Sequence, residues 1–140
     1  AEIYQAACLA ENAALRGDVA AARRSFEALL ARPGLPPATQ GWFLTSLAEL
    51  EERERRGGAA DAAYRRVLAL GPDTYAAIAY ADFLIAQGRP AEALATLQRE
   101  PRTDAVLLRL TIAGSRAKAA TFSPVLRERR TSIAILTLPG

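Results

Sequence analysis

Residues 17–30 read GDVAAARRSFEALL, a glycine followed at fixed spacings by an alanine and a large apolar side chain. The same order returns about 71 residues later, in GRPAEALATL at residues 88–97. Between them, ADAAYRRVLALGP at residues 60–72 repeats the step from alanine to an aromatic residue and ends at a proline that stops a helix. The three segments are about 34 to 38 residues apart. Self-similarity at such a period is typical of proteins built from stacked structural repeats.

Glycine and proline divide each repeat into two helices. Gly17 can adopt the left-handed conformation that closes one helix, and Asp18 can then accept hydrogen bonds from the first N–H groups of the next. Gly88 and Pro90 form the equivalent turn in the third repeat. The second repeat has Arg55 at this place, so its first helix is expected to continue to the glycine pair at 57–58 and to shift the turn. The sequence predicts helices at about 2–16, 19–31, 38–55, 59–70, 74–87, 90–99 and 104–118.

The repeat pattern stops after Lys118. Ser123 and Pro124 are a good helix start and predict a short helix to about Arg130, whereas the β-branched and apolar residues 131–140 predict an extended end. Because a solenoid usually ends in a capping element, segment 119–140 is interpreted as a cap folded back over the last apolar surface, with disorder or an interaction tail as alternatives. The helix at 103–118 is expected to present an apolar face formed by Leu107, Leu108, Leu110 and Ile112.

Composition favours an all-α protein that is not an enzyme. Hydrophobic residues make up 51% of the 140 but aromatic residues only 6%, because the strong helix formers alanine and leucine dominate. Histidine is absent and Cys8 is the only cysteine, which excludes a histidine-based triad, a histidine/cysteine zinc site and an internal disulfide. Lys118 is the only lysine and no glycine-rich phosphate loop occurs, so no cofactor is expected. Cys8 itself is expected to be a small buried hydrophobe.

Other sequence features bear on location and source. No run approaches the roughly 20 apolar residues of a membrane-spanning helix, so no membrane insertion is expected. The chain begins without methionine, which indicates a fragment or a processed mature form and leaves the compartment open between the cytoplasm and export. The bias of 17 arginines to one lysine is typical of a GC-rich bacterial gene.

The repeats resemble those of the tetratricopeptide family, whose pattern combines two small residues, a glycine, an aromatic residue and a proline. The resemblance implies an all-α, right-handed superhelix of helical hairpins over residues 1–118, with units at about 2–35, 38–72 and 74–101, a partial unit at 103–118, and a separate C-terminal segment at 119–140. The matching residues are Ala10, Gly17, Ala22, Phe26 and Pro33 in the first unit, Ala48, Ala60, Tyr64 and Pro72 in the second, and Ala81, Gly88, Ala93 and Leu97 in the third.

In this family the first helices of the units line a concave groove. The groove positions implied by the resemblance hold an aromatic residue and an acid in every unit, which predicts a site for a basic or amphipathic peptide, because rings supply contact area and carboxylates attract cations. The alternative is that the rings pack on the preceding unit and the acids are merely solvated. The candidate groove residues are Tyr4, Trp42 and Tyr75, the acids Glu11, Glu49 and Asp82, and the neighbouring Thr45 and Ile78.

The resemblance and the charge distribution together predict a non-enzymatic scaffold for protein–protein interaction. The first 100 residues carry 11 basic and 13 acidic side chains, whereas residues 101–140 carry seven basic and two acidic ones. An acidic groove and a basic C-terminal part also suggest the alternative of a self-associating module, in which the tail mediates oligomerisation. Nucleic-acid binding is not expected, because the basic run is short and lacks interleaved aromatic residues.

Overall fold

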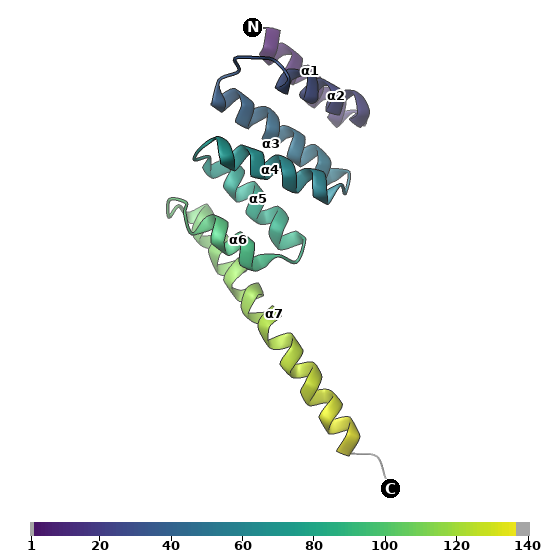
Figure 1. The fold of residues 1–140 in the computed structure, drawn as a ribbon, viewed down its shortest axis with the longest axis vertical. Coiled ribbons are helices and arrows are strands. Elements are labelled where there is room, and N and C mark those ends of the chain that lie inside the picture. The colour runs from purple at the N-terminus through teal and green to yellow at the C-terminus, as the bar shows by residue number, and fades with distance from the viewer. Residues whose placement is uncertain (1, 137–140) are drawn as a thin grey trace.

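The computed structural model describes the backbone of residues 2–136 and the side chains of residues 2–121. The described chain is all-helical and contains no strand, which confirms the predicted all-α class. The first six helices begin and end within about two residues of their predicted bounds. The helices, shown in Figure 1, are α1 (Glu2–Leu15), α2 (Val19–Leu30), α3 (Pro37–Arg53), α4 (Gly57–Leu70), α5 (Thr74–Ala86), α6 (Pro90–Leu97) and α7 (Asp104–Leu136).

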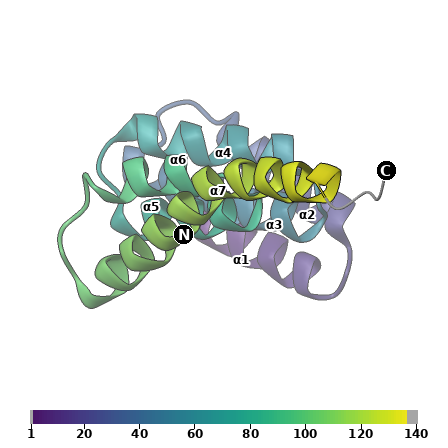
Figure 2. The same ribbon diagram turned by 90° about the horizontal axis from the view of Figure 1, so that it is seen from below.

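The helices form three hairpins, α1–α2, α3–α4 and α5–α6, stacked one after another with α7 following the last (Figure 1). Each odd-numbered helix also contacts the next odd-numbered helix, so that α1, α3, α5 and α7 form a continuous inner row. Within the described residues, α2, α4 and α6 make no comparable backbone approach to one another. Seen along the stack, α4 and α6 lie on one side and α1, α3 and α5 on the other (Figure 2).

Small residues lie where the two helices of each hairpin cross. Ala22, Ala48, Ala60, Ala81 and Ala93 are completely buried, and the absence of a larger side chain lets the helix axes approach closely. The space around these crossings is filled by large buried side chains, which form a nearly continuous apolar core from the first hairpin to the third. The largest of them are Phe26, Phe43, Tyr64 and Phe83.

The three hairpin turns have the same backbone structure. Gly17, Arg55 and Gly88 have φ values of 87°, 57° and 73°, in the left-handed region. In each turn the next residue donates its N–H to a carbonyl five residues back, at 2.9, 2.9 and 2.8 Å, while the left-handed residue bonds three residues back. This is the Schellman arrangement that closes a helix. The expectation of a longer third helix is therefore wrong, because α3 ends at Arg53, Arg55 takes the glycine conformation, and the glycine pair at 57–58 begins α4.

Replacing Arg55 with glycine is expected to stabilise the protein by about 0.5–1 kcal/mol. A non-glycine residue in the left-handed region costs about 1–2 kcal/mol, part of which is offset by the larger backbone entropy of glycine in the unfolded chain. The matched control is Gly88→Ala, since a Cβ at Gly88 would meet no atom within 4 Å and would add only the conformational cost. Urea unfolding should move the two variants in opposite directions. A loss of stability in Arg55→Gly would contradict this account of the turn.

The C-terminal helix differs from the prediction. The 33-residue α7 runs from Asp104 to Leu136 without a break at 118/119 and extends away from the stack (Figure 1). Residues 123–130 are helical as expected but belong to this one continuous helix, whereas the extended structure expected at 131–136 and the folded-back cap are wrong; residues 137–140 lie outside the described part. The physical reason lies before Ser123, where three alanines with the highest helix propensity carry the helix past the expected end.

The predicted apolar face of α7 is only partly buried. Val106 and Ala113 are completely buried, whereas Leu107, Leu108 and Ile112 are 45%, 59% and 38% exposed. These three side chains stay exposed because α5 and α6, the described helices that contact α7, cover the side that carries Val106 and Ala113. In the chain described here, α7 included, no helix has both the length and the hydropathy needed to cross a bilayer.

Candidate functional site

A cavity of about 320 Å³ opens on the inner row of helices, between α1, α3 and the start of α5. We refer to it as the groove pocket. It brings together five of the eight predicted groove residues, although they are up to 64 positions apart in the sequence. The lining residues are Glu11, Ala38, Trp42, Thr45, Ser46, Glu49, Asp73 and Tyr75.

The aromatic side chains at the groove pocket combine packing and exposure. Tyr4 stacks on Trp42 with ring centroids 6.0 Å apart and planes inclined by 20°. Trp42 is half-buried and also touches Phe43, with centroids 5.1 Å apart, so part of its surface belongs to the core. Tyr4 and Tyr75 remain 55% and 66% exposed. A stacked pair of rings thus stands at one side of the pocket and Tyr75 lines another.

The two predicted acids of the pocket are held by hydroxyl groups. Ser46 Oγ donates a hydrogen bond to Glu11 Oε1 at 3.1 Å, and Tyr75 Oη donates to Glu49 Oε1 at 2.8 Å. The bond to Glu49, together with its negative charge, raises the pKa of Tyr75, so the phenol remains a donor at neutral pH. An ionised carboxylate has about four acceptor sites. Each of these acids is therefore oriented by one hydroxyl and keeps capacity for further donors.

Glu52, one turn along α3 from Glu49, adds to the negative field of the groove. Its Oε2 accepts a hydrogen bond from Tyr64 Oη at 3.2 Å. Burial raises the pKa of the Glu52 carboxyl against the opposite effect of that hydrogen bond, and the charges of Glu49 and Asp82 raise it further. This mutual repulsion indicates that the acids of α3 and α5 act on one another, so a cation placed between them would be favoured.

Three further predicted groove residues are buried, partly buried or already paired with an arginine of the same chain. Thr45 lines the pocket but is buried, and its hydroxyl donates to the Gly41 carbonyl at 2.9 Å. Ile78 is partly buried against the core of the last hairpin. Asp82 is bound by an arginine of α7, since Arg109 Nε lies 2.9 Å from both Asp82 carboxylate oxygens and Nη2 lies 2.8 Å from Oδ2.

Sequence reasoning missed two ion-pair clusters. Glu51 on α3 is only 3% exposed and pairs with Arg23 of α2, with Nη2 to Oε2 at 3.1 Å, and with Arg56 of the next turn at 3.3 Å. Nothing in the acid-rich run at 49–54 distinguishes Glu51 from the neighbouring acids, which are less buried. The cluster connects the first hairpin to the second.

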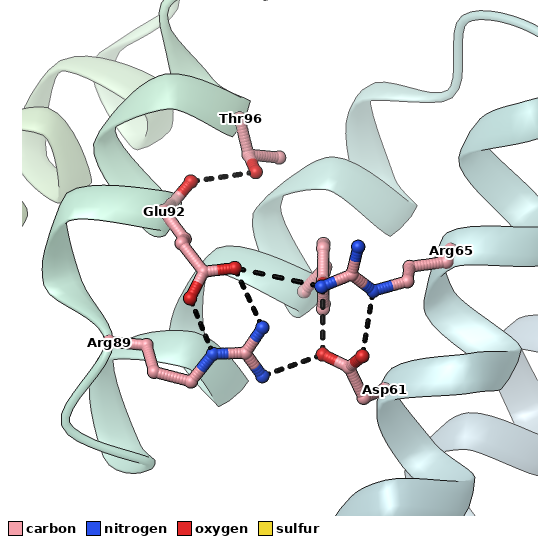
Figure 3. Close-up of polar contacts among 6 residues, drawn as sticks. Asp61, Arg65, Arg89, Glu92 and Thr96 are labelled. Atoms are coloured by element: carbon pink, nitrogen blue, oxygen red, sulfur yellow. Dashed lines mark hydrogen bonds and ion pairs between the residues drawn. The ribbon is translucent and has the colours of Figure 1, made fainter.

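The second cluster joins α4 to the start of α6 and is shown in Figure 3. Asp61 accepts from Arg65 and Arg89, both at 2.7 Å, and Glu92 pairs with Arg89 at 2.7 Å and with Arg65 at 3.6 Å. Burial alone would raise the pKa of Asp61, but hydrogen bonds from the two arginines and Tyr80 outweigh it and lower the pKa. The stability that this shift contributes is present above the usual value of 3.8 and is lost as the pH falls through the folded-state pKa.

The chain has one cysteine and no histidine, so few of its side chains are of the kinds that react covalently or bind transition metals. Cys8, expected to be buried, is exposed on α1, because Ala7 and Ala10 occupy the face that contacts the core. Among the described residues, no group of three or more acids or thiols is placed to hold a metal ion.

No family model matches the chain, and no curated protein and no solved structure matches it significantly.

Proposed function

We propose that this chain is a tetratricopeptide-like scaffold that binds a basic or amphipathic segment of a protein partner along its inner row of helices. The proposal rests chiefly on the groove pocket, which places Glu11 and Glu49 beside the rings of Trp42 and Tyr75. Carboxylates and aromatic faces both attract cationic side chains. The scaffold performs no chemistry of its own, and its partner is a protein rather than a nucleic acid.

The repeat architecture of the proposal is supported by the backbone. The turns at Gly17, Arg55 and Gly88 repeat the same two hydrogen bonds, and buried alanines recur at the helix crossings of successive hairpins. Identical turns give the three hairpins a similar internal shape, and stacked hairpins of similar shape are the arrangement from which a solenoid with a concave surface is built. The inner row of α1, α3 and α5 is then the surface on which a peptide segment lies.

Charge is expected to decide which segment binds. We expect peptides graded from acidic to basic to be captured in order of positive charge, because the acids of the groove pocket gain charge-assisted hydrogen bonds. In Glu11→Gln/Glu49→Gln, affinity for the best basic peptide should fall about tenfold or more, since a hydrogen bond to a charged group contributes about 1.5–3 kcal/mol. Isothermal titration calorimetry at 50 and 200 mM salt measures both the affinity and its screening.

The control is Glu27→Gln/Glu54→Gln, which removes two charges from the exposed surface of α2 and the end of α3. This pair should bind the basic peptide within about twofold of the unaltered chain, because screening weakens charges outside the pocket. Equal losses in both double variants would mean that only the net charge matters. Capture of no peptide at any charge would overturn the free-groove proposal.

A second candidate function is self-association through the C-terminal helix. The Arg109–Asp82 pair is the observation that favours it, because an arginine of α7 already binds an acid of the inner row within one molecule. The part of α7 beyond the stack is basic in sequence and extends away from the body (Figure 1). If no added peptide binds and the mass of the chain rises with its concentration, the groove is occupied by a second copy.

A further inference from the structure

We propose that the groove pocket recognises one arginine side chain of the partner, and prefers arginine to lysine. This inference rests on the proposed function, since it names the side chain that the peptide segment places in the pocket. The arginine guanidinium would bond to Glu11 and Glu49 and lie against a ring of Trp42 or Tyr75. A volume of about 320 Å³ is at the lower end of ligand pockets, which suits one long side chain rather than a whole helix.

Glu11 and Glu49 differ from four other acids of the chain in having no arginine partner in the part that the structure describes. Glu51, Asp61, Asp82 and Glu92 are each paired with at least one arginine. Within the described residues, by contrast, no ion pair involves Glu11 or Glu49, which instead accept from the hydroxyls of Ser46 and Tyr75. A hydroxyl orients a carboxylate without forming an ion pair, and Arg53, which lines the adjoining cavity with both acids, is not paired with either. The pocket is therefore arranged to accept a cation from outside.

The Arg109–Asp82 pair shows how the same row of helices binds a guanidinium. Arg109 Nε lies 2.9 Å from both oxygens of Asp82 and Nη2 lies 2.8 Å from Oδ2, a contact made from the next helix of the stack. Such multiple bonding requires the planar fork of arginine, which an ammonium group lacks. Asp82 follows Tyr75 by seven residues on α5, as Glu11 follows Tyr4 on α1 and Glu49 follows Trp42 on α3. The three acids therefore occupy equivalent places.

The rings of the pocket provide the second reason for arginine. A guanidinium stacks flat on an aromatic face and is more weakly hydrated than an ammonium, so it loses less solvation energy when it enters a pocket with aromatic walls. Trp42 is fixed for such a contact because Tyr4 stacks on it at 6.0 Å and Phe43 supports it at 5.1 Å. The phenol of Tyr75 is fixed by its bond to Glu49. A preorganised wall reduces the entropy lost on binding.

The test compares three capped 12-residue peptides that differ at three equivalent positions, occupied by arginine, by lysine or by the neutral arginine analogue citrulline. Binding is followed by the emission of Trp42, the only tryptophan of the chain, and by calorimetry. We expect the arginine peptide to bind at least about tenfold more tightly than the lysine peptide, as one added charge-assisted contact would give. Glu49→Gln should reduce this ratio to about one, while the exposed Glu27→Gln should leave it unchanged.

The outcomes separate this inference from the proposed function. If the arginine and lysine peptides bind equally and more tightly than the citrulline peptide, the arginine preference is wrong and the basic-segment scaffold stands. If no peptide binds, both are wrong. If the arginine preference persists in Glu49→Gln, arginine is recognised elsewhere and the assignment to the groove pocket is overturned.

Discussion

Replacing Glu51 with alanine is expected to lower the free energy of unfolding by about 3 kcal/mol. The carboxylate is 3% exposed and bonds to Arg23, whose own side chain is only 20% exposed. This bond is the main reason that the pKa of Arg23 is raised above its usual value. Without Glu51, the partly buried Arg23 guanidinium would lose its hydrogen-bonding partner, and the polar link from α2 to α3 would be lost. Urea unfolding followed by circular dichroism measures the change.

Two further variants test whether the loss of stability comes from the unpaired charge and from its burial. Glu51→Met retains most of the volume and should cost less than Glu51→Ala when combined with Arg23→Met, because an apolar pair can replace a buried ion pair. Asp82→Ala breaks a pair whose side chains are 49% and 27% exposed, and should cost about 1 kcal/mol or less. If Glu51→Ala costs no more than Asp82→Ala, burial does not make the Glu51 cluster important for stability.

Replacing Trp42 with alanine is expected to weaken binding of a basic peptide by about 1–4 kcal/mol, the range for a central aromatic residue of an interface. The ring lines the groove pocket and stacks on Tyr4, so its removal also leaves the exposed Tyr4 without its neighbour. Calorimetry with the arginine peptide measures the loss. Because Trp42 also contacts Phe43 in the core, the unfolding curve of the same variant must be recorded.

Trp42→Phe is the control for this effect, since it keeps an aromatic ring against Phe43 with a smaller face toward the pocket. We expect it to fold as the unaltered chain does and to bind with intermediate affinity, because a phenyl ring attracts a cation less strongly than an indole. Full binding by a folded Trp42→Ala protein would mean that Trp42 only packs in the core.

Local signals explain how much of the fold could be predicted from the sequence. Gly17, Gly88 and Pro90 determine their turns through their own backbone preferences, so the first six helices were predicted within about two residues. Arg55 has no such preference. It adopts the left-handed conformation because the hydrogen bonds of the turn between α3 and α4 require it. The course of α7 beyond Lys118 differs from the prediction because the alanines before Pro124 favour a continuous helix more strongly than the proline opposes it.

The candidate site also contains residues that could be predicted from the sequence and contacts that could not. The groove positions implied by the family resemblance include Glu11, Trp42, Glu49 and Tyr75, which line one pocket. The partner of Asp82 could not be predicted, because Arg109 is 27 residues away and reaches Asp82 only through the crossing of α5 and α7. The burial of Glu51 likewise depends on where α2 lies against α3, which no pattern within α3 reveals.

Between α4 and the start of α6, an ion-pair bridge lies beside the apolar core. Along the inner row the helices touch directly, whereas α4 and the start of α6 are bridged by Asp61, Arg65, Arg89 and Glu92 beside a cavity of about 420 Å³. Apolar contact is insensitive to ionic strength, but attraction between partly exposed charges is screened by salt. Added salt should therefore weaken this bridge while leaving the apolar core that α4 and α6 share in place.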